Sequence, residues 1–366
     1  MVPLLPVLAG DFATNVGTAG GVIAAYSIPY GLFQLGYGPI GDRVGKLRVM
    51  IVAMILFAAG TFACAFAPTL GTLITLRFLT GAAAAGLIPL TLAYIGDHFS
   101  YQDRQAAIGS YLASVALGSI LGTSIGGVVA DFLSWRSIFL AYGAISVGVF
   151  ALMWRAGREF PEERKPGPLV DLASFRAYGR LLREPAPRLV LIAVFVEGFF
   201  FFGAFAYMGA FLRETYGLPY LAIGVILSGF GIGNLIYSRT SRWVIRVLGE
   251  NGQVLVGGWL MCGGYLVIAL VASWPLFALV NVVLGVGFVL LHTTLQTKAT
   301  ELAPGARGTT IALFAFCLFM GQGLGTAAQG WLVNQAGYSV ALITAAIPMV
   351  LLVQWFVWVV RRQSGR

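Results

Sequence analysis

The sequence predicts an all-α integral membrane protein built from two six-helix bundles that are related by an internal repeat. Three observations support this fold class. The chain of 366 residues is 58% hydrophobic and only 10% charged, whereas soluble proteins are about a quarter charged. Its apolar residues fall in blocks of about 20, the length that a helix needs to cross a hydrocarbon core about 30 Å thick. Motifs in the first half of the chain also recur in the second half.

Eleven apolar blocks are long enough to be transmembrane helices. A further apolar block at residues 1–9 covers less than half of the hydrocarbon core at about 1.5 Å per residue. We expect this block to be the outer end of a first helix that is truncated in this chain. The eleven expected spans lie at residues 19–40, 49–67, 70–95, 106–130, 136–153, 189–211, 219–237, 254–272, 275–297, 309–334 and 339–360.

The internal repeat appears as pairs of similar residues separated by 203 or 204 positions. Residues 118–123 recur as residues 321–326, and Arg104 matches Arg307. Two parallel repeats of six helices are typical of secondary transporters. The repeat predicts an amino-terminal bundle at 1–153 (a remnant of helix 1 plus helices 2–6), a linker at 154–188 and a carboxyl-terminal bundle at 189–366 (helices 7–12).

The basic residues predict how the chain lies in the membrane. When the spans are threaded in order, 20 of the 23 Lys and Arg residues fall on one side, and cytoplasmic loops are enriched in these residues. We therefore expect a multi-pass protein of a bacterial-type inner (plasma) membrane with a cytoplasmic carboxyl terminus. This topology accounts for the net charge of +9 without nucleic-acid binding. The three cysteines lie in apolar blocks, and no metal-ligand spacing is present, so we expect no metal.

The linker at 154–188 carries eight basic residues and five prolines, which are typical of a connection between two membrane halves. Within it, Arg176, Arg180 and Arg183 recur at helical spacing. Residues 169–182 could therefore form a short helix on the membrane surface. The alternative is a solvated linker whose charge only fixes the topology.

Three motifs resemble those of the major facilitator superfamily. The loop Gly38-Pro-Ile-Gly-Asp42-Arg43-Val-Gly45-Lys46-Leu-Arg48 resembles the signature loop of that family, and Arg77-Phe-Leu-Thr-Gly81 resembles its fourth-helix motif. The stretch Gly118-x-x-x-Gly122-Thr123-x-x-Gly126-Gly127 resembles the fifth-helix motif of drug:proton antiporters and sugar efflux permeases, although Thr123 stands where that motif usually has proline. The resemblance implies alternating access, with helices 1, 4, 7 and 10 lining a central cavity.

The signature loop has a physical interpretation of its own. Gly45 permits a tight turn, Asp42 can lie against a helix amino terminus, and Lys46 can pair with Asp97 at the end of helix 4. The family resemblance implies that such contacts hold the two halves together until the cytoplasmic side opens; a charged turn that only fixes topology is the alternative. The expected gating residues are Gly38, Asp42, Arg43, Gly45, Lys46, Arg48 and Asp97.

The glycines of the fifth helix predict close helix packing. Glycines at four-residue spacing let two backbones approach one another. Helix 11 has similar glycines at 321, 323 and 325, so both helices could slide during transport. The expected packing residues are Gly118, Gly122, Thr123, Gly126 and Gly127.

Two ionisable residues, Arg77 and Glu197, lie well inside expected spans. A charge near the bilayer centre costs at least about 2.5–3.5 kcal/mol, so such residues usually have a function. We expect Glu197 to carry the proton and Arg77 to bind an anionic group or to act on Glu197. The alternatives are a permanently protonated Glu197 that is bonded to a neighbouring helix and a structural Arg77 that is bonded to carbonyls. The expected cavity residues are Arg77, Glu197, Phe201, Phe205, Asn281, His292 and Gln296.

Together these features predict a proton-coupled secondary transporter that exports a small organic molecule, either drug-like or a sugar. No span presents a nucleophile with a His or Asp partner, and no phosphate-binding loop is present. We therefore expect no enzyme and no cofactor besides the proton gradient. The expected partners are a small-molecule substrate, protons and the bilayer, with the chain acting as a monomer. The alternatives are a sugar or metabolite uniporter or symporter, and a membrane sensor or scaffold that does not transport.

Overall fold

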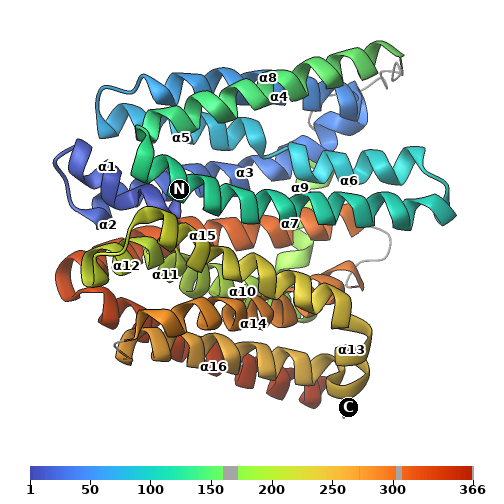
Figure 1. The fold of residues 1–366 in the computed structure, drawn as a ribbon. Coiled ribbons are helices and arrows are strands. Elements are labelled where there is room, and N and C mark those ends of the chain that lie inside the picture. The colour runs from blue at the N-terminus through green and yellow to red at the C-terminus, as the bar shows by residue number, and fades with distance from the viewer. Residues whose placement is uncertain (160–171, 272, 302–306, 365–366) are drawn as a thin grey trace.

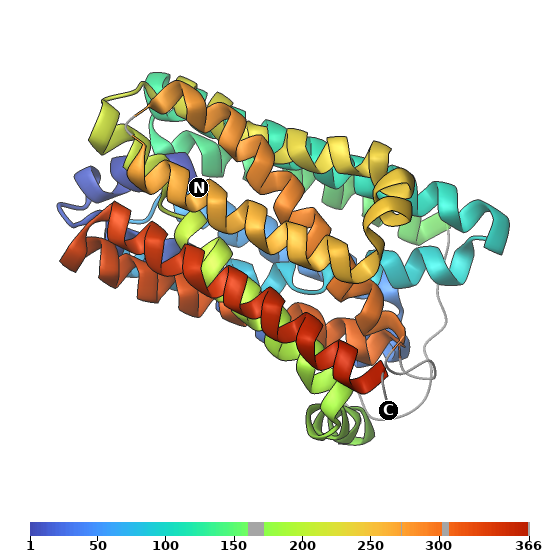
Figure 2. The ribbon, with the colours of Figure 1, turned by 90° about the horizontal axis from the view of Figure 1, so that it is seen from below.

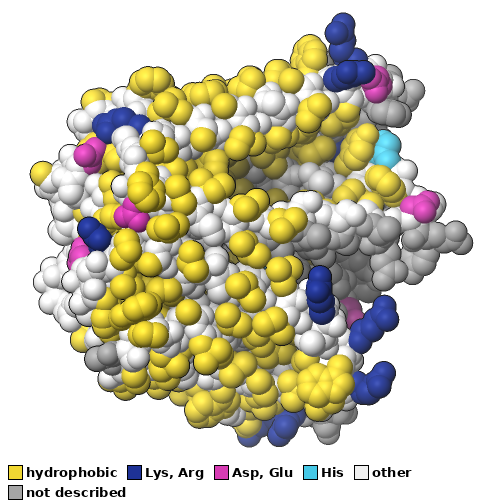
Figure 3. All heavy atoms as spheres, viewed as in Figure 1, with side chains coloured by type: hydrophobic (Ala, Val, Ile, Leu, Met, Phe, Trp, Pro, Cys, Tyr) yellow, Lys and Arg dark blue, Asp and Glu magenta, His cyan; other side chains and the backbone are white. Residues whose placement is uncertain are grey.

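The computed structural model describes residues 1–159, 172–271, 273–301 and 307–364, and within these ranges every regular element is helical. Two bundles of roughly parallel helices lie one above the other in Figure 1. Nine of the described helices are long and apolar enough to cross a membrane. Figure 3 shows apolar side chains across the middle of the surface and charged side chains at its two ends. The all-α membrane fold is therefore confirmed.

Residues 1–159 form the first half, and its helices follow the expected spans closely. The span expected at 70–95 is divided in two at residues 85–86, where a Cβ atom on Gly86 would lie 2.4 Å from the Tyr37 ring. The helices are η1 (Val2–Leu4), α1 (Leu5–Asp11), α2 (Val16–Ala19), α3 (Gly21–Val44), α4 (Lys46–Ala65), α5 (Leu70–Ala84), α6 (Leu87–His98), α7 (Tyr101–Phe132) and α8 (Trp135–Glu159).

The second half begins at Pro185. Its helices are α10 (Pro185–Glu197), the π-helical turn η2 (Gly198–Phe202), α11 (Gly203–Phe205), α12 (Met208–Tyr216), α13 (Tyr220–Leu270), α14 (Trp274–Glu301), α15 (Arg307–Ala336) and α16 (Tyr338–Ser364). The expected seventh helix is thus interrupted by η2. The long α13 contains the expected eighth and ninth spans, separated at Gly249, whose φ is 60°.

The turn at Gly249 repeats a turn of the first half. Gly45, which is 204 positions earlier, has a φ of 105° and separates α3 from α4. A positive φ strains residues that carry a side chain, whereas glycine adopts it readily. Both halves therefore reverse direction between their second and third helices at an equivalent glycine. We call the end of the molecule that carries these two turns the basic end, and the other end the opposite end.

The described part of the expected linker is helical. The helix α9 (Leu172–Arg183) lies across the other helices near the basic end and is seen nearly end-on in Figure 2. Its Tyr178 and Leu181 are buried, and the Tyr178 hydroxyl donates a hydrogen bond to the Leu35 carbonyl. These contacts favour a short helix packed on the bundle over a solvated linker. Residues 160–171 of this linker lie outside the described part of the chain.

The two halves meet mainly where α3 packs on α15 and α7 packs on α13. A Cβ atom on Gly127 would lie 2.4 Å from the Tyr220 carbonyl oxygen, so the backbones of α7 and α13 are in direct contact there. The expected close packing is thus present at Gly127. At Gly118, by contrast, no described atom lies within 4 Å of such a Cβ atom. The Thr123 hydroxyl donates to the carbonyls one turn earlier in the helix, and α7 continues without a break.

The remaining glycines of this motif make ordinary contacts. A Cβ atom on Gly122 would lie 3.6 Å from the Tyr142 hydroxyl, and one on Gly126 would lie 3.8 Å from Pro3. Among the described residues, the motif therefore provides one close crossing between the halves, at Gly127, rather than a continuous glycine face.

Candidate functional site

The buried acid of the second half is paired with a histidine. Glu197 is the last residue of α10 and is 0% exposed. Its Oε2 atom lies 3.0 Å from Nδ1 of His292 on α14, whereas its Oε1 atom is buried without a hydrogen-bond partner among the described residues. A buried polar atom without a partner costs about 1–3 kcal/mol. Glu197 therefore keeps one oxygen free to accept or hold a proton.

His292 connects this acid to less buried surroundings. Its side chain is 15% exposed, and its ring stacks on Phe288 with a centroid distance of 4.8 Å. Histidine is the side chain that most readily exchanges protons near neutral pH. A fully buried carboxylate and a partly exposed imidazole are therefore in direct contact.

The chain geometry directly after Glu197 is unusual. Residues Gly198–Phe202 form one π-helical turn, and such turns are often found at functional sites. Inside it, the Tyr265 hydroxyl donates a 2.6 Å hydrogen bond to the Phe201 carbonyl. A Cβ atom on Gly198 would lie 2.3 Å from the Leu318 carbonyl of α15. The turn is thus held in place by α13 on one side and by α15 on another.

Two phenylalanines that we expected to face a substrate are buried in this structure. Phe201 is 0% exposed and Phe205 is 8% exposed. They pack against each other and against the rings of Phe230 and Phe288. In this conformation the two rings therefore face an aromatic cluster of the second half rather than an open cavity.

Arg77 lies in the first half and does not pair with Glu197. Its guanidinium carbon lies 4.1 Å from the centroid of the Tyr26 ring, an arrangement that favours a cation–π attraction. No carboxylate pairs with Arg77 among the described residues. Its Nε atom is buried without a hydrogen-bond partner there. Arg77 therefore lies over Tyr26 and does not contact Glu197, whose described partner is His292.

The polar residues expected on helix 10 have different surroundings. Asn281 is 0% exposed, and its amide donates to the Phe277 carbonyl of its own helix at 2.8 Å. Gln296, two turns closer to the basic end than Phe288, is exposed. Among the described residues, His292 contacts Glu197, whereas no hydrogen bond joins Asn281 or Gln296 to that pair.

The signature loop forms an expected ion pair, but the pair does not join the two halves. Lys46 at the start of α4 pairs with Asp97 near the end of α6, and it also pairs with Asp42 at 3.1 Å. All three residues belong to the first half. The expectation that this pair holds the two halves together is therefore wrong. Asp42 pairs with Lys46, which is the first residue of α4.

The other loop residues shape the turn around this pair. Gly45 makes the reversal between α3 and α4, and no described atom lies within 4 Å of a Cβ atom placed on Gly38. Arg43 and Arg48 are partly exposed at the basic end. The second half has an equivalent ion pair of reversed polarity, in which Glu250 on α13 lies 2.5 Å from Lys298 on α14.

Contacts that the sequence did not reveal join the two halves at the opposite end. The carboxylate of Asp131, at the end of α7, accepts hydrogen bonds from the backbone N–H groups of Tyr220 and Leu221 at the start of α13. The Asn334 amide donates to the Asn15 side chain at 2.7 Å, and the Gly17 N–H donates to Asn334. These bonds hold the opposite end closed in this structure.

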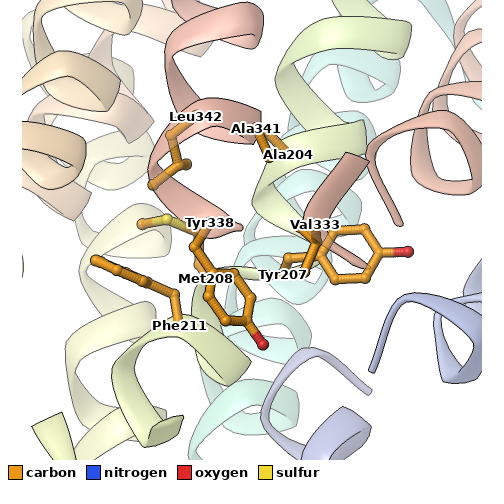
Figure 4. Close-up of a pocket in the computed structure, with 8 residues that line it drawn as sticks. All are labelled: Ala204, Tyr207, Met208, Phe211, Val333, Tyr338, Ala341 and Leu342. Atoms are coloured by element: carbon orange, nitrogen blue, oxygen red, sulfur yellow. The ribbon is translucent and has the colours of Figure 1, made fainter. Parts of the chain in front are cut away.

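Tyr207 adds to this closure. In Figure 4 its ring points away from Phe211 and Tyr338, which line the same small pocket. Its hydroxyl lies 2.8 Å from the Thr326 carbonyl and 3.3 Å from the Gly17 carbonyl of the first half. The sequence signal for these residues is weak, because polar side chains at the ends of apolar spans are common.

Known proteins are similar to this chain in sequence and in fold. The Major Facilitator Superfamily model matches residues 1–318. The MFS-type transporter YceJ of Bacillus subtilis is 29% identical over 337 residues, which cover 90% of this chain and 84% of that protein. Multidrug resistance protein 1 of the same bacterium is 22% identical, with coverage of 97% and 91%. A solved POT family transporter in complex with a thioalcohol-conjugated peptide has a TM-score of 0.80 at 14% identity, covering 99% of this chain and 92% of its own.

The match to the family model extends over most of the chain, including the signature loop and the Arg77 and Glu197 positions. The fold similarity to the solved transporter covers both halves. The chain belongs to the Major Facilitator Superfamily and is a membrane transporter.

Proposed function

We propose that this transporter is coupled to protons and exports a small organic molecule, with Glu197 and His292 as the proton-binding pair. The observation that carries this proposal is the fully buried Glu197 carboxylate, with one oxygen on His292 and the other without a partner. An unpaired charge in the bilayer interior costs at least about 2.5–3.5 kcal/mol. A site that retains a carboxyl group there, with one oxygen paired and the other free, is suited to binding and releasing a proton.

The proton cycle follows from the pair and from alternating access. When Glu197 is protonated it is neutral, so it can pass through a closed state at little cost. When it loses the proton, the carboxylate is stabilised by a protonated His292. Because both groups lie in the second half, proton binding acts on α10 and α14, and the π-turn after Glu197 transmits the change to α15.

The hydrogen bonds between the two halves at the opposite end support a conformation in which the transporter opens at the basic end. The bonds of Asp131, Asn334 and Tyr207 join the halves at the opposite end, whereas the described ion pairs at the basic end each lie within one half. With the cytoplasm at the basic end of a bacterial plasma membrane, this is the state in which an exporter loads its substrate. The orientation rests on the Lys and Arg distribution.

We propose that Arg77 is the residue of the first half that contacts the substrate. Its buried Nε atom lacks a partner among the described residues, and its guanidinium lies over Tyr26. A planar or anionic organic molecule would satisfy both features. Export as the direction is supported by the similarity to Multidrug resistance protein 1 of Bacillus subtilis.

A second candidate, a sugar or metabolite symporter, is favoured by Thr123. It replaces the expected proline and leaves α7 continuous. Purified protein in proteoliposomes, assayed with ethidium, riboflavin and a sugar panel under an imposed pH gradient, separates these functions. Exchange of at least one compound against protons supports the proposal. Movement of the compound and protons in the same direction supports the symporter, and transport that does not depend on the pH gradient supports a uniporter. The match to the transporter family argues against the non-transporting sensor or scaffold.

A further inference from the structure

A pocket on the outer face of the first half, distant from the Glu197 pair, has the features of a lipid site. It has a volume of about 610 Å³ and lies between the basic ends of α3, α4 and α8. Ligand pockets usually have volumes of about 300–1,000 Å³. Its lining residues are Tyr37, Ile40, Val44, Arg48, Val49, Ile51, Val52, Ala53, Leu56, Trp154, Gly157 and Arg158.

The pocket is divided into a charged mouth and an apolar floor. Arg48 lies in the first turn of α4, and Arg158 lies in the last turn of α8, so both guanidinium groups are at the basic end. Val52 and Leu56 follow Arg48 at four-residue intervals on one side of α4, and both are 57% exposed. Leu56 is eight residues from Arg48, or about 12 Å along the helix. The floor therefore extends into one leaflet of a core about 30 Å thick.

The charges of the mouth are not neutralised within the described residues. Arg48 and Arg158 take part in none of the ion pairs found there, and the acidic neighbours Asp42 and Glu159 pair with Lys46 and Arg155 instead. The amino terminus of α4 adds partial positive charge at the same place. Trp154 completes the mouth, and tryptophan is enriched where a membrane protein meets the headgroup region.

We propose that this pocket binds one anionic phospholipid of the leaflet at the basic end, with its phosphate between Arg48 and Arg158 and an acyl chain along Val52 and Leu56. The two guanidinium groups supply charge complementarity to the phosphate. The apolar floor distinguishes a lipid from a free phosphate ion. This site is independent of the transported substrate and of proton coupling.

The internal repeat provides a natural comparison. At an offset of 204, Trp154 corresponds to Trp358 and Arg158 to Arg362, whose guanidinium carbon lies 3.8 Å from the Trp358 ring centroid. Arg48, however, corresponds to Gly252. The second half therefore keeps the Trp–Arg pair but lacks the second arginine, and we expect it to hold an anionic lipid less well.

Native mass spectrometry of the purified full chain in detergent tests the site. The protein is mixed with equal amounts of dioleoyl phosphatidylglycerol and dioleoyl phosphatidylcholine, and the bound lipids are counted. We expect a preference for phosphatidylglycerol that falls about fivefold for R48Q or R158Q and about thirtyfold for both, given the usual contribution of one basic residue beside an anionic leaflet. The double variant R239Q/R242Q, on the exposed surface of α13 in the second half, removes the same charge and should keep the preference.

Three results would overturn the proposal. The first is an equal loss of preference in R239Q/R242Q, which would indicate a general basic surface. The second is displacement of phosphatidylglycerol by millimolar inorganic phosphate, which would indicate an ion site without an acyl-chain contact. The third concerns the double variant R48Q/R158Q. Unchanged binding of phosphatidylcholine to R48Q/R158Q serves as the control for folding, and retained preference in that variant would also contradict the assignment.

Discussion

Asp131 Oδ2 accepts a 2.6 Å hydrogen bond from the Leu221 N–H, so a carboxylate of the first half caps the first helix turn of α13 in the second half. Asp131 Oδ1 accepts a second bond from the Tyr220 N–H at 3.0 Å. Carboxylates are stabilised at helix amino termini because the free N–H groups and the helix dipole both favour negative charge. This contact couples closure of the opposite end to the capping of a helix.

The first prediction concerns this cap. D131A should favour molecules that are open at the opposite end, because a cap of this type contributes about 1 kcal/mol. The ratio of closed to open molecules should then fall about fivefold. Distances between spin labels placed on the two halves at this end would report the change. D103A is the matched control, since Asp103 bonds to Ser100 within the same half; equal distance distributions for D131A and wild type would refute the role.

The second prediction concerns the packing of the π-turn. G198A and G325A should both lower the unfolding temperature. The added Cβ atom would lie 2.3 Å from the Leu318 carbonyl oxygen in G198A and 2.0 Å from the Phe199 carbonyl oxygen in G325A. Overpacking of this kind costs about 1–3 kcal/mol. G263A is the control, since no described atom lies within 4 Å of its Cβ position. Thermal unfolding in detergent would separate them, and an unchanged temperature for G198A and G325A would show that the two helices are not in backbone contact.

The third prediction concerns acid stability. Hydrogen bonds from the Trp135 indole and from Arg136 hold the pKa of Asp11 below its ordinary value of 3.8. The unfolded chain then binds more protons than the folded chain in the range between the two values. The stabilising contribution of Asp11 is therefore complete above about pH 4–5 and is lost as the pH falls through the pKa of the folded state.

Acid titration of tryptophan fluorescence would test this contribution. D11N should be less stable than wild type at neutral pH and should lose less stability than wild type below pH 4, since it cannot titrate. The effect should be small, because Asp11 is about half exposed and solvent weakens exposed ion pairs. Parallel acid curves for the two proteins would contradict the assignment.

The sequence predicted the helices well but not their interruptions. The lengths of the apolar blocks predicted where the spans lie, because membrane thickness sets the length that a helix needs to cross it. The Tyr37 ring packs beside Gly86 at the break at 85–86, and Tyr265 and α15 contact the π-turn. These neighbours lie in other helices, so local sequence does not reveal them.

The sequence singled out Glu197, Arg77 and His292 as candidate residues, but it did not predict the contact between Glu197 and His292. The free-energy cost of burying a charged side chain identified Glu197 and Arg77, because a lone charge in an apolar span is unfavourable unless it has a partner or a function. The partner of Glu197 is 95 positions away, and spacing alone does not reveal such a contact. The Lys46–Asp97 pair was predicted from a motif, yet its role between the halves was not correct, because both residues belong to the first half.

The central claim is that Glu197 carries the coupled proton, and gradient-driven transport by E197Q tests it most directly. With a compound that wild-type proteoliposomes accumulate under a pH gradient, we predict that E197Q loses gradient-driven accumulation but retains exchange of labelled for unlabelled compound. E184Q, which alters an exposed acid at the start of the same helix, should behave as wild type. Full gradient-driven accumulation by E197Q would contradict the account.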